Sequence, residues 1–400
     1  MLTRRYLTSF YLSCLFLGPF FFAHPLHADE SLQVRFEENP WISTRAMGMA
    51  EAISPLASGI DAAYYNPAGI GGLTPQNKNA WARQLLFPYV GTSMNAHALN
   101  LGQDWGAKGG IQSGTLGDAV LKSHAGKRQS ARISGLFDLT LQRIELLEFW
   151  DYQILMLEQA NSDPEKSLLI RTRSRSGPGL GFSVTNAAEN FYLGLFSSYV
   201  TQNELDEQTN FSKIANIDTR NKFLSEHVQS KTTLKHNLGL RWTFGKKSEW
   251  ALSLVGRGFQ LNSSTSSAKS LGLRTPTEED LTSKDLDALI LGTSYSLQLK
   301  SFLTLQTVLE TKNLSSDLVS IPDKIRLGSE LNFAGTGLLG ERALLSLRTG
   351  LNTTGISFGL GLHLGLLGLE FASYIQDIGM EGRPVVDRRQ ALVFYVDAAQ

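Results

Sequence analysis

The 400-residue chain has a single cysteine, Cys14, and no excess of charge of either sign. One thiol excludes disulfide frameworks and cysteine-rich zinc sites. Its 37 basic and 37 acidic residues cancel, and no basic stripe appears, so recognition of nucleic acid through counterion release is excluded. Charged residues amount to 18%, below the roughly 25% of a typical soluble domain. No apolar run reaches the roughly 20 residues of a membrane-spanning helix.

The first residues have the features of a secretory signal peptide. Arg4 and Arg5 precede a short apolar stretch, residues 12–23, and the region ends on the small residue Ala28. Residues 1–28 are therefore predicted to be a signal peptide that exports the rest of the chain.

From residue 179 onward, apolar and polar residues alternate with a period of two, which predicts strands. In the clearest run, Ile356 to Leu364, apolar residues alternate with Ser357, Gly359 and other small or polar residues. Each run is about ten residues long, the length of a tilted strand that crosses a bilayer. Because the second face is rich in glycine, serine and threonine, we expect an apolar exterior and a lumen lined by small residues.

The connections and the aromatic residues favour the same membrane barrel. Trp242, Phe244 and Trp250 flank one hairpin on the apolar face, as expected of an interfacial girdle. Short turns are predicted near 365–366, 335–341, 300–301, 245–248 and 187–189. Outer loops are predicted at 377–388, 353–354, 313–324, 262–287 and 202–233, of which only 353–354 is short. Short inner turns and long outer loops are typical of outer-membrane barrels.

Counting back toward the N-terminus gives further strands near 178–186, 167–174, 131–142 and 93–102. The predicted fold is all-β, an antiparallel transmembrane barrel of about fourteen strands over residues 79–400. Segment 144–160 has apolar residues at helical spacing, among them Phe149 and Trp150, and is predicted to be an inserted amphipathic helix. Its role is left open between a lumen plug, a surface helix and a miscounted strand.

A segment rich in small residues, 29–78, precedes the first predicted strand. Its alanines and glycines allow close packing against a barrel wall, and Asn66-Pro67 is a turn signal. We interpret it as a hatch, a compact plug that precedes the barrel.

This segment resembles the FadL/TodX family of outer-membrane transporters, with their PorV-like and TraF-like relatives. The positions that carry the resemblance are Arg45, Gly48, Asp61, Asn66, Pro67 and Ala68, in that order along the chain. The resemblance implies a fourteen-stranded barrel whose hatch closes the lumen, with the hatch role carried by residues 66–68. It also implies passive uptake of small hydrophobic molecules, fatty-acid-like or aromatic.

The alternative is a PorV-like or TraF-like scaffold in secretion or surface assembly. The expected partners are outer-membrane lipid, a small hydrophobic ligand, the barrel-assembly machinery and, for the scaffold, a secretion-system component. The sequence does not identify ligand-binding residues.

Catalytic motifs are only apparent, and we expect no enzyme, no cofactor and no metal site. The run 355–359 matches G-x-S-x-G, but it opens a strand, whereas a nucleophile elbow needs a strand before the serine and a helix after it. Ser357 and His363 lie roughly 20 Å apart along that strand at about 3.4 Å per residue. The histidines lack metal-ligand spacing, and the acidic run 278–280 is interpreted as a solvated loop.

Overall fold

A computed structural model of the chain describes residues 36–37, 39–71, 84–107, 124, 126–158, 168–209, 222–223, 226–245, 249–264, 289–314, 321–334, 343–378 and 385–397. The predicted signal peptide and the acidic run 278–280 lie outside these residues.

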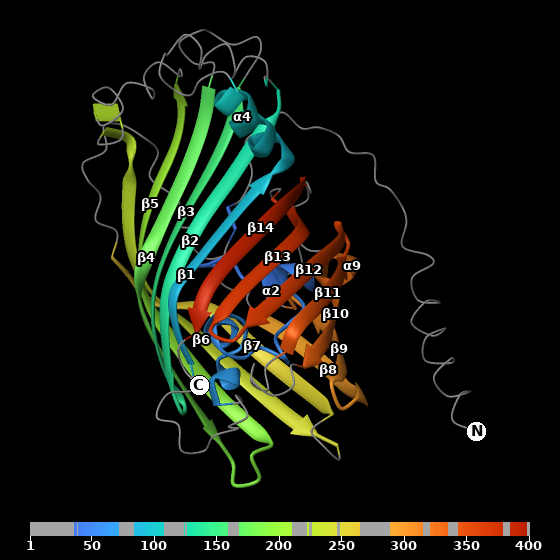
Figure 1. The fold of residues 1–400 in the computed structure, drawn as a ribbon. Coiled ribbons are helices and arrows are strands. Elements are labelled where there is room, and N and C mark those ends of the chain that lie inside the picture. Colours follow the sequence, from blue (N-terminus) through green and yellow to red (C-terminus); the bar gives the residue numbers. More distant parts are fainter. Residues whose placement is uncertain are drawn as a thin grey trace. The chain divides into compact units, whose positions relative to one another are not determined.

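Fourteen antiparallel strands close into a barrel, in which each strand pairs with its neighbours in sequence and β1 pairs with β14 (Figure 1). The strands are β1 (Gln84–Asn95), β2 (Arg128–Leu141), β3 (Ile144–Glu158), β4 (Leu168–Thr185), β5 (Phe191–Thr209), β6 (Gln229–Phe244), β7 (Trp250–Ser264), β8 (Leu289–Lys300), β9 (Leu303–Thr311), β10 (Ile325–Ala334), β11 (Ala343–Asn352), β12 (Gly355–Leu364), β13 (Leu367–Asp377) and β14 (Val386–Asp397). The predicted fold class and strand number are confirmed. Closure leaves no edge strand, so the backbone groups of the sheet pair within it.

The described helices are short. They are α2 (Thr44–Gly48), α3 (Ile60–Tyr65), the 3-10 helix η1 (Pro67–Gly71), α4 (Ala96–Ala107) and α9 (Ile321–Lys324). The Ser43 side chain caps α2 by accepting a hydrogen bond from the Ala46 amide. Within the described part of the chain, no helix has the length and apolarity that a membrane crossing requires.

The outer face of the barrel is apolar, as the alternation predicted. In β12, Phe358 and Leu360 are 53% and 43% exposed, whereas Ser357 between the outward positions is fully buried. The rings of Trp242, Phe244 and Trp250 also lie on the outer face, where they contact one another in series. A closed barrel with this exterior is the architecture of an outer-membrane protein.

The two ends of the barrel differ. Connections at 142–143, 186–190, 301–302 and 365–366 define a short-turn end. The opposite, long-connection end carries 159–167, 210–228, 265–288 and 378–385, together with the short turn at 353–354. The expected loop at 202–233 is shorter than predicted, because β5 continues to Thr209 and β6 begins at Gln229. β4 and β5, with 18 and 19 residues, form a taller wall than β9 with 9 (Figure 1).

The predicted helix at 144–160 is wrong, because this segment is β3. Ile144, Leu146 and Trp150 face outward, while Leu147 and Phe149 face inward and join a buried apolar cluster. Since apolar side chains occupy both faces, the period of two is hidden and a helical spacing appears by coincidence. Residues 167–174 and 178–186, predicted as two strands, form the single strand β4, so two opposite errors left the count at fourteen.

The first strand was also misplaced. We predicted a strand at 93–102, whereas β1 covers Gln84–Asn95 and α4 follows from Ala96. The Asn95 side chain explains the end of the strand, because its Oδ1 accepts a hydrogen bond from the Ala98 amide at 2.9 Å, as a helix N-cap does.

Candidate functional site: the N-terminal segment and the inner wall

Residues 36–37 and 39–71, called here the N-terminal segment, contact the inner faces of strands on different sides of the barrel. The Ile42 amide donates to Ser134 Oγ of β2 at 3.0 Å, and the Ser54 amide donates to Glu310 Oε2 of β9 at 2.9 Å. Asn66 Nδ2 donates to the Leu240 carbonyl of β6 at 3.3 Å. Because these strands belong to one closed ring, the segment lies inside the lumen.

Apolar packing fills the space between the segment and part of the wall. Trp41, Ile42 and Met47 are at most 1% exposed and pack against inward residues of β1–β3, β5, β13 and β14, among them Phe149 and Val393. Burial of large side chains such as these typically contributes roughly 1.5–3 kcal/mol each. The segment is therefore part of the core and not a tail resting in a channel.

Glycines on the inner wall allow this close approach. A Cβ atom at position 194 would lie 2.1 Å from the carbonyl carbon of Pro67, and one at position 350 would lie 2.2 Å from the carbonyl carbon of Met49. A side chain at either position would overlap the backbone of the segment. The predicted small-residue lumen is therefore found where the wall meets the segment.

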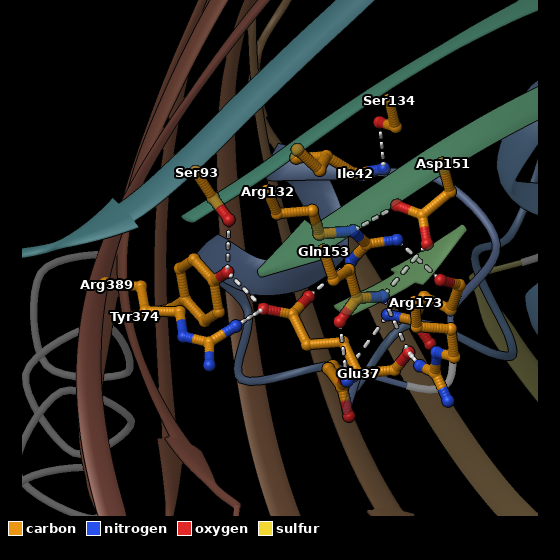
Figure 2. A network of polar contacts seen from close by, with 12 residues as sticks. Glu37, Ile42, Ser93, Arg132, Ser134, Asp151, Gln153, Arg173, Tyr374 and Arg389 are labelled. Carbon is orange, nitrogen blue, oxygen red and sulfur yellow. Dashed lines mark hydrogen bonds and ion pairs between the residues drawn. The ribbon is translucent and has the colours of Figure 1, made fainter. Parts of the chain in front are cut away.

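Glu37 is held at the long-connection end by a network of buried charges, shown in Figure 2. Its carboxylate pairs with Arg132 and Arg389 and accepts a hydrogen bond from the Tyr374 hydroxyl at 2.9 Å. Its backbone carbonyl accepts from Gln153 Nε2 at 3.1 Å. Strands β2, β3, β13 and β14 thus hold one residue of the segment.

Further carboxylates balance the arginines of this network. Asp151 Oδ1 pairs with Arg132 Nε at 2.5 Å, and Asp151 Oδ2 pairs with Arg175 Nη2 at 2.7 Å. Asp387 Oδ2 pairs with Arg389 Nε at 2.7 Å. Each of these groups is at least nine-tenths buried, and such pairs are costly to break because the remaining charge has no water to solvate it.

A second charged cluster holds α2. Arg45 Nη2 pairs with Glu330 Oε2 at 2.8 Å, and the same carboxylate pairs with Arg348 Nε at 2.8 Å. Arg348 Nη1 reaches Glu370 Oε2 at 3.0 Å, and Thr44 Oγ1 donates to that same oxygen at 2.5 Å. The predicted hatch residue Arg45 is therefore one of the groups that join the segment to β10, β11 and β13.

A third cluster surrounds Glu51. This carboxylate pairs with Arg326 and, at 3.5 Å, with Lys312 Nζ, and it accepts a hydrogen bond from Asn39 Nδ2 at 3.1 Å. Burial acts to raise the pKa of Glu51, but the positive charges of Arg326 and Lys312 outweigh it and hold the pKa well below its usual range. Glu51 therefore remains ionised through mildly acid conditions.

The other predicted hatch residues lie within the segment. Gly48 ends α2 against Gly359 of β12, where a Cβ atom would lie 2.9 Å from the Gly359 Cα. Asp61 Oδ1 accepts a hydrogen bond from Ser43 Oγ at 2.6 Å. Pro67 and Ala68 open η1 next to Gly194. The structure thus places all six residues at internal joints of the segment or at its contacts with the wall.

Asn66 joins three parts of the structure through one fully buried side chain. Nδ2 donates to the Ser54 carbonyl at 3.0 Å and to the Leu240 carbonyl, while Oδ1 accepts from the Ala68 amide at 3.1 Å. The amide group is needed because the site requires a donor and an acceptor together.

Asn66→Ala is expected to destabilise the packed segment by about 2–3 kcal/mol, because it leaves buried backbone groups unpaired. Hydrogen exchange within residues 53–71 should become faster. Asn66→Asp retains the acceptor for the Ala68 amide but loses the donor, so it should exchange as fast as the alanine variant. Protection equal to wild type in both variants would contradict this role.

Asp61 makes the packing of the segment sensitive to pH. Burial raises the pKa of its carboxyl to about 6, an effect that the Arg45 charge and the Ser43 hydrogen bond oppose only in part. The unfolded aspartate has a pKa of about 3.9. Because the folded chain holds this proton more tightly, the stabilisation is complete below about pH 4 and is lost as the pH rises through about 6.

We therefore expect residues 41–71 to be better protected from hydrogen exchange at pH 4.5 than at pH 7.5, after correction for intrinsic exchange rates. The difference should correspond to about 2 kcal/mol, because the stabilisation is complete only below about pH 4. Asp61→Asn should remove it, since the amide does not titrate. Better protection at pH 7.5 than at pH 4.5 in the wild type would show that another group dominates.

The charged wall was missed by the sequence analysis. Glu37, Arg132, Asp151, Arg348 and Glu370 were not singled out there. A usable signal was nevertheless present, because Arg171, Arg173 and Arg175 recur at alternate positions of one strand and therefore share a face. Their pairing with carboxylates depends on strand register, since Arg171 lies opposite Asp206 of β5 and Arg175 lies opposite Asp151 of β3.

The apparent catalytic motif has no catalytic geometry. Ser357 Oγ is fully buried without a hydrogen-bond partner, and His363 Nε2 instead contacts the Tyr395 hydroxyl. Within the described residues, no group of three or more histidine, cysteine, aspartate or glutamate side chains could hold a metal ion.

Comparisons with known proteins show similarity of the barrel only. No family model and no curated protein matches the sequence. The toluene transporter TodX of Pseudomonas putida is similar in structure, with a TM-score of 0.48 and 10% identity over 92% of this chain and 100% of that one. A deltaS2 mutant of the TodX monoaromatic hydrocarbon channel gives a TM-score of 0.49 at 9% identity, covering 91% of this chain and 100% of that one. Outer membrane phospholipase A of Escherichia coli gives a TM-score of 0.29 at 11% identity, covering 82% of this chain and 97% of that one.

Proposed function

We propose that this chain is an outer-membrane barrel that admits small hydrophobic molecules, with its N-terminal segment as the hatch. One observation supports this proposal more than any other. Inward-facing apolar residues gather at the long-connection end, next to the Glu37 network. They are Phe36, Leu155, Leu157 and Ile378, with Leu169 and Val385 packed against them.

Toward the short-turn end, polar and charged side chains come next after this apolar cluster along the strands. On β3, Leu157 and Leu155 precede Gln153 and Asp151 in the direction of the short-turn end. The four buried members of the cluster are at most 8% exposed, so an apolar molecule entering from the long-connection end has to separate these side chains before it reaches the fixed charges of the closed hatch. Ions and polar solutes gain nothing from the apolar cluster, and the buried ion pairs behind it leave no unpaired charge to attract them.

We assign the long-connection end to the cell exterior, because outer-membrane barrels have long extracellular loops and short periplasmic turns. The motif resemblance of residues 45–69 supports the hatch role. We propose the hatch role and substrate uptake together, with the barrel-assembly machinery or a secretion-system component as protein partners.

The test is uptake of a labelled long-chain fatty acid and of a labelled monoaromatic compound by a deletion strain carrying the gene on a plasmid. Wild-type protein should raise uptake of at least one of them. Leu155→Glu with Leu157→Glu should abolish the gain at equal barrel abundance, because it places charge in the apolar cluster. The control is Glu148→Gln, which changes the charge on the outer face of the same strand and leaves the cluster intact.

Equal uptake with and without the protein would contradict the transport proposal. In that case the scaffold alternative predicts a stable partner, which can be sought by cross-linking through the loops at 210–228 and 265–288.

A further inference from the structure

Two buried carboxyl groups at the short-turn end form no ion pair with a basic residue among the residues that the structure describes. Asp138 of β2 and Glu145 of β3 both point into the lumen and are 0% exposed. The two side chains lie within hydrogen-bonding reach of each other. Thr140, which is paired with Glu145 across the strands, adds a hydroxyl 3.4 Å from Asp138 Oδ2.

The oxygens of this pair lack donors. Both carboxylate oxygens of Glu145 and Oδ1 of Asp138 are buried without a hydrogen-bond partner. The charged groups whose fields act on the pair are acidic as well, Asp397 on Asp138 and Asp61 on Glu145. Apart from the contact between the two carboxyl groups themselves, the donor that reaches either of them from the described residues is the Thr140 hydroxyl, at a distance too long for a strong hydrogen bond.

The contrast with the rest of the lumen makes this arrangement unusual. Five other buried carboxylates of the described residues each form an ion pair with an arginine, namely Glu37, Asp151, Glu330, Glu370 and Asp387. Glu310 instead accepts hydrogen bonds from the backbone amides of Ile53 and Ser54. At these six positions the fold compensates the buried negative charge, and a buried carboxylate without such compensation costs several kcal/mol.

We infer that Asp138 and Glu145 bind one divalent cation of the calcium type. The donor set consists of hard oxygens, four from the two carboxylates and one from the Thr140 hydroxyl. Ca²⁺ takes six to eight oxygen ligands in irregular geometry, whereas Mg²⁺ demands a near-ideal octahedron. Two carboxylates and one divalent ion are electrically neutral together, which removes the charge that the lumen leaves unpaired.

The location gives the ion a structural role. Gly181 of β4 faces both Glu145 and Ile70, since a Cβ atom there would lie 3.5 Å from the Glu145 Cβ and 2.6 Å from the Ile70 Cδ1. Ile70 belongs to η1, the last helical turn of the N-terminal segment. A cation would therefore stiffen the β2–β3 wall close to η1. This inference does not depend on the proposed transport function.

The test uses full-length mature protein, refolded in a non-ionic detergent free of lipopolysaccharide and stripped with a chelator at pH 7.5. Calcium chloride is titrated in by calorimetry. One ion per chain is expected to bind, and Asp138→Asn with Glu145→Gln should weaken the affinity at least 10-fold. Glu148→Gln removes the same charge from the outer face of β3, three residues away, and should bind as the wild type does.

A second measurement uses the wild type alone, so that misfolding of a variant leaves the proposal testable. Saturating Ca²⁺ should raise the temperature at which the folded band disappears on a gel, relative to chelator, by roughly 5 °C or more. Equal transitions with calcium and with chelator, or undiminished binding by the double variant, would overturn the site. A transition that depends on pH but not on calcium would mean that the pair shares a proton instead, and this outcome also overturns it.

Discussion

Arg348→Ala should lower the stability of the folded barrel by about 3–5 kcal/mol, one of the two largest effects expected here. Arg348 lies between Glu330 and Glu370, at 2.8 and 3.0 Å, and all three side chains are at least nine-tenths buried. Removing the guanidinium leaves Glu370 with no arginine and Glu330 with Arg45 alone. The uncompensated negative charge has no water to solvate it.

The measurement is the temperature at which the heat-modifiable folded band is lost, together with the urea midpoint in detergent. Arg388→Ala is the matched control, because Arg388 lies on the exposed face of β14 and only donates hydrogen bonds to Ser373 Oγ and the Ile356 carbonyl. Its removal should cost less than about 1 kcal/mol. Equal losses in the two variants would show that the buried pairs contribute no more than an exposed arginine does.

Gly194→Val is expected to displace the N-terminal segment from the wall while leaving the barrel closed. A Cβ atom at this position would lie 2.1 Å from the Pro67 carbonyl carbon and 2.3 Å from the Ala68 amide nitrogen. Both neighbours are backbone atoms, so no side-chain rotation relieves the overlap. Overpacking of this kind costs about 3 kcal/mol, the upper end of the usual range, and the cost falls on the contact with η1 because the β5 ladder itself is intact.

Two readouts follow from this displacement. Residues 53–71 should become accessible to protease, and ion conductance in planar bilayers should rise from near zero to a resolved open level. Gly102→Ala serves as the control, since a Cβ atom at position 102 of α4 meets nothing within 4 Å. Wild-type protection and conductance in Gly194→Val would contradict both the packing argument and the hatch proposal.

A segment that becomes accessible to protease while the conductance stays unchanged would separate the packing argument from the hatch proposal. In that case the overlap with Pro67 displaces the segment as expected, but the segment does not close the lumen. The hatch role would then be lost, whereas the structural description of Asn66, Arg45 and their wall contacts would stand.

The sequence predicted the barrel well because lipid imposes one rule on every strand. Outward positions must be apolar and the side-chain period is two, so Ile356, Phe358 and Leu360 identify a strand without any knowledge of its neighbours. The same rule explains the failure at β3. There the inner positions Leu147 and Phe149 are apolar too, because they pack against Trp41 and other buried residues of the N-terminal segment and not against water.

The predicted hatch residues were found from a local motif, and their contacts were not predictable from it. Asn66-Pro67 signals a turn, which η1 contains. The partner of Asn66 on the wall is the Leu240 carbonyl, 174 residues away, and that of Arg45 is Glu330, 285 residues away. Nothing in the sequence near positions 45 or 66 indicates which strand each side chain meets.

By itself, then, the sequence determined the outward faces of the strands and the small-residue character of the segment before them, whereas its strand number agreed only because the missed β3 and the divided β4 cancelled. These are properties of single residues and of their spacing. Only the tertiary structure decided that Glu37, Asp151, Glu330 and Glu370 find arginines while Asp138 and Glu145 do not. The physical reason is that charge compensation depends on the register of neighbouring strands and on the path of the N-terminal segment inside the barrel. Glu330 lies directly opposite Arg348 on the adjacent strand, whereas Glu37 meets Arg132 and Arg389 because the segment lies inside the lumen.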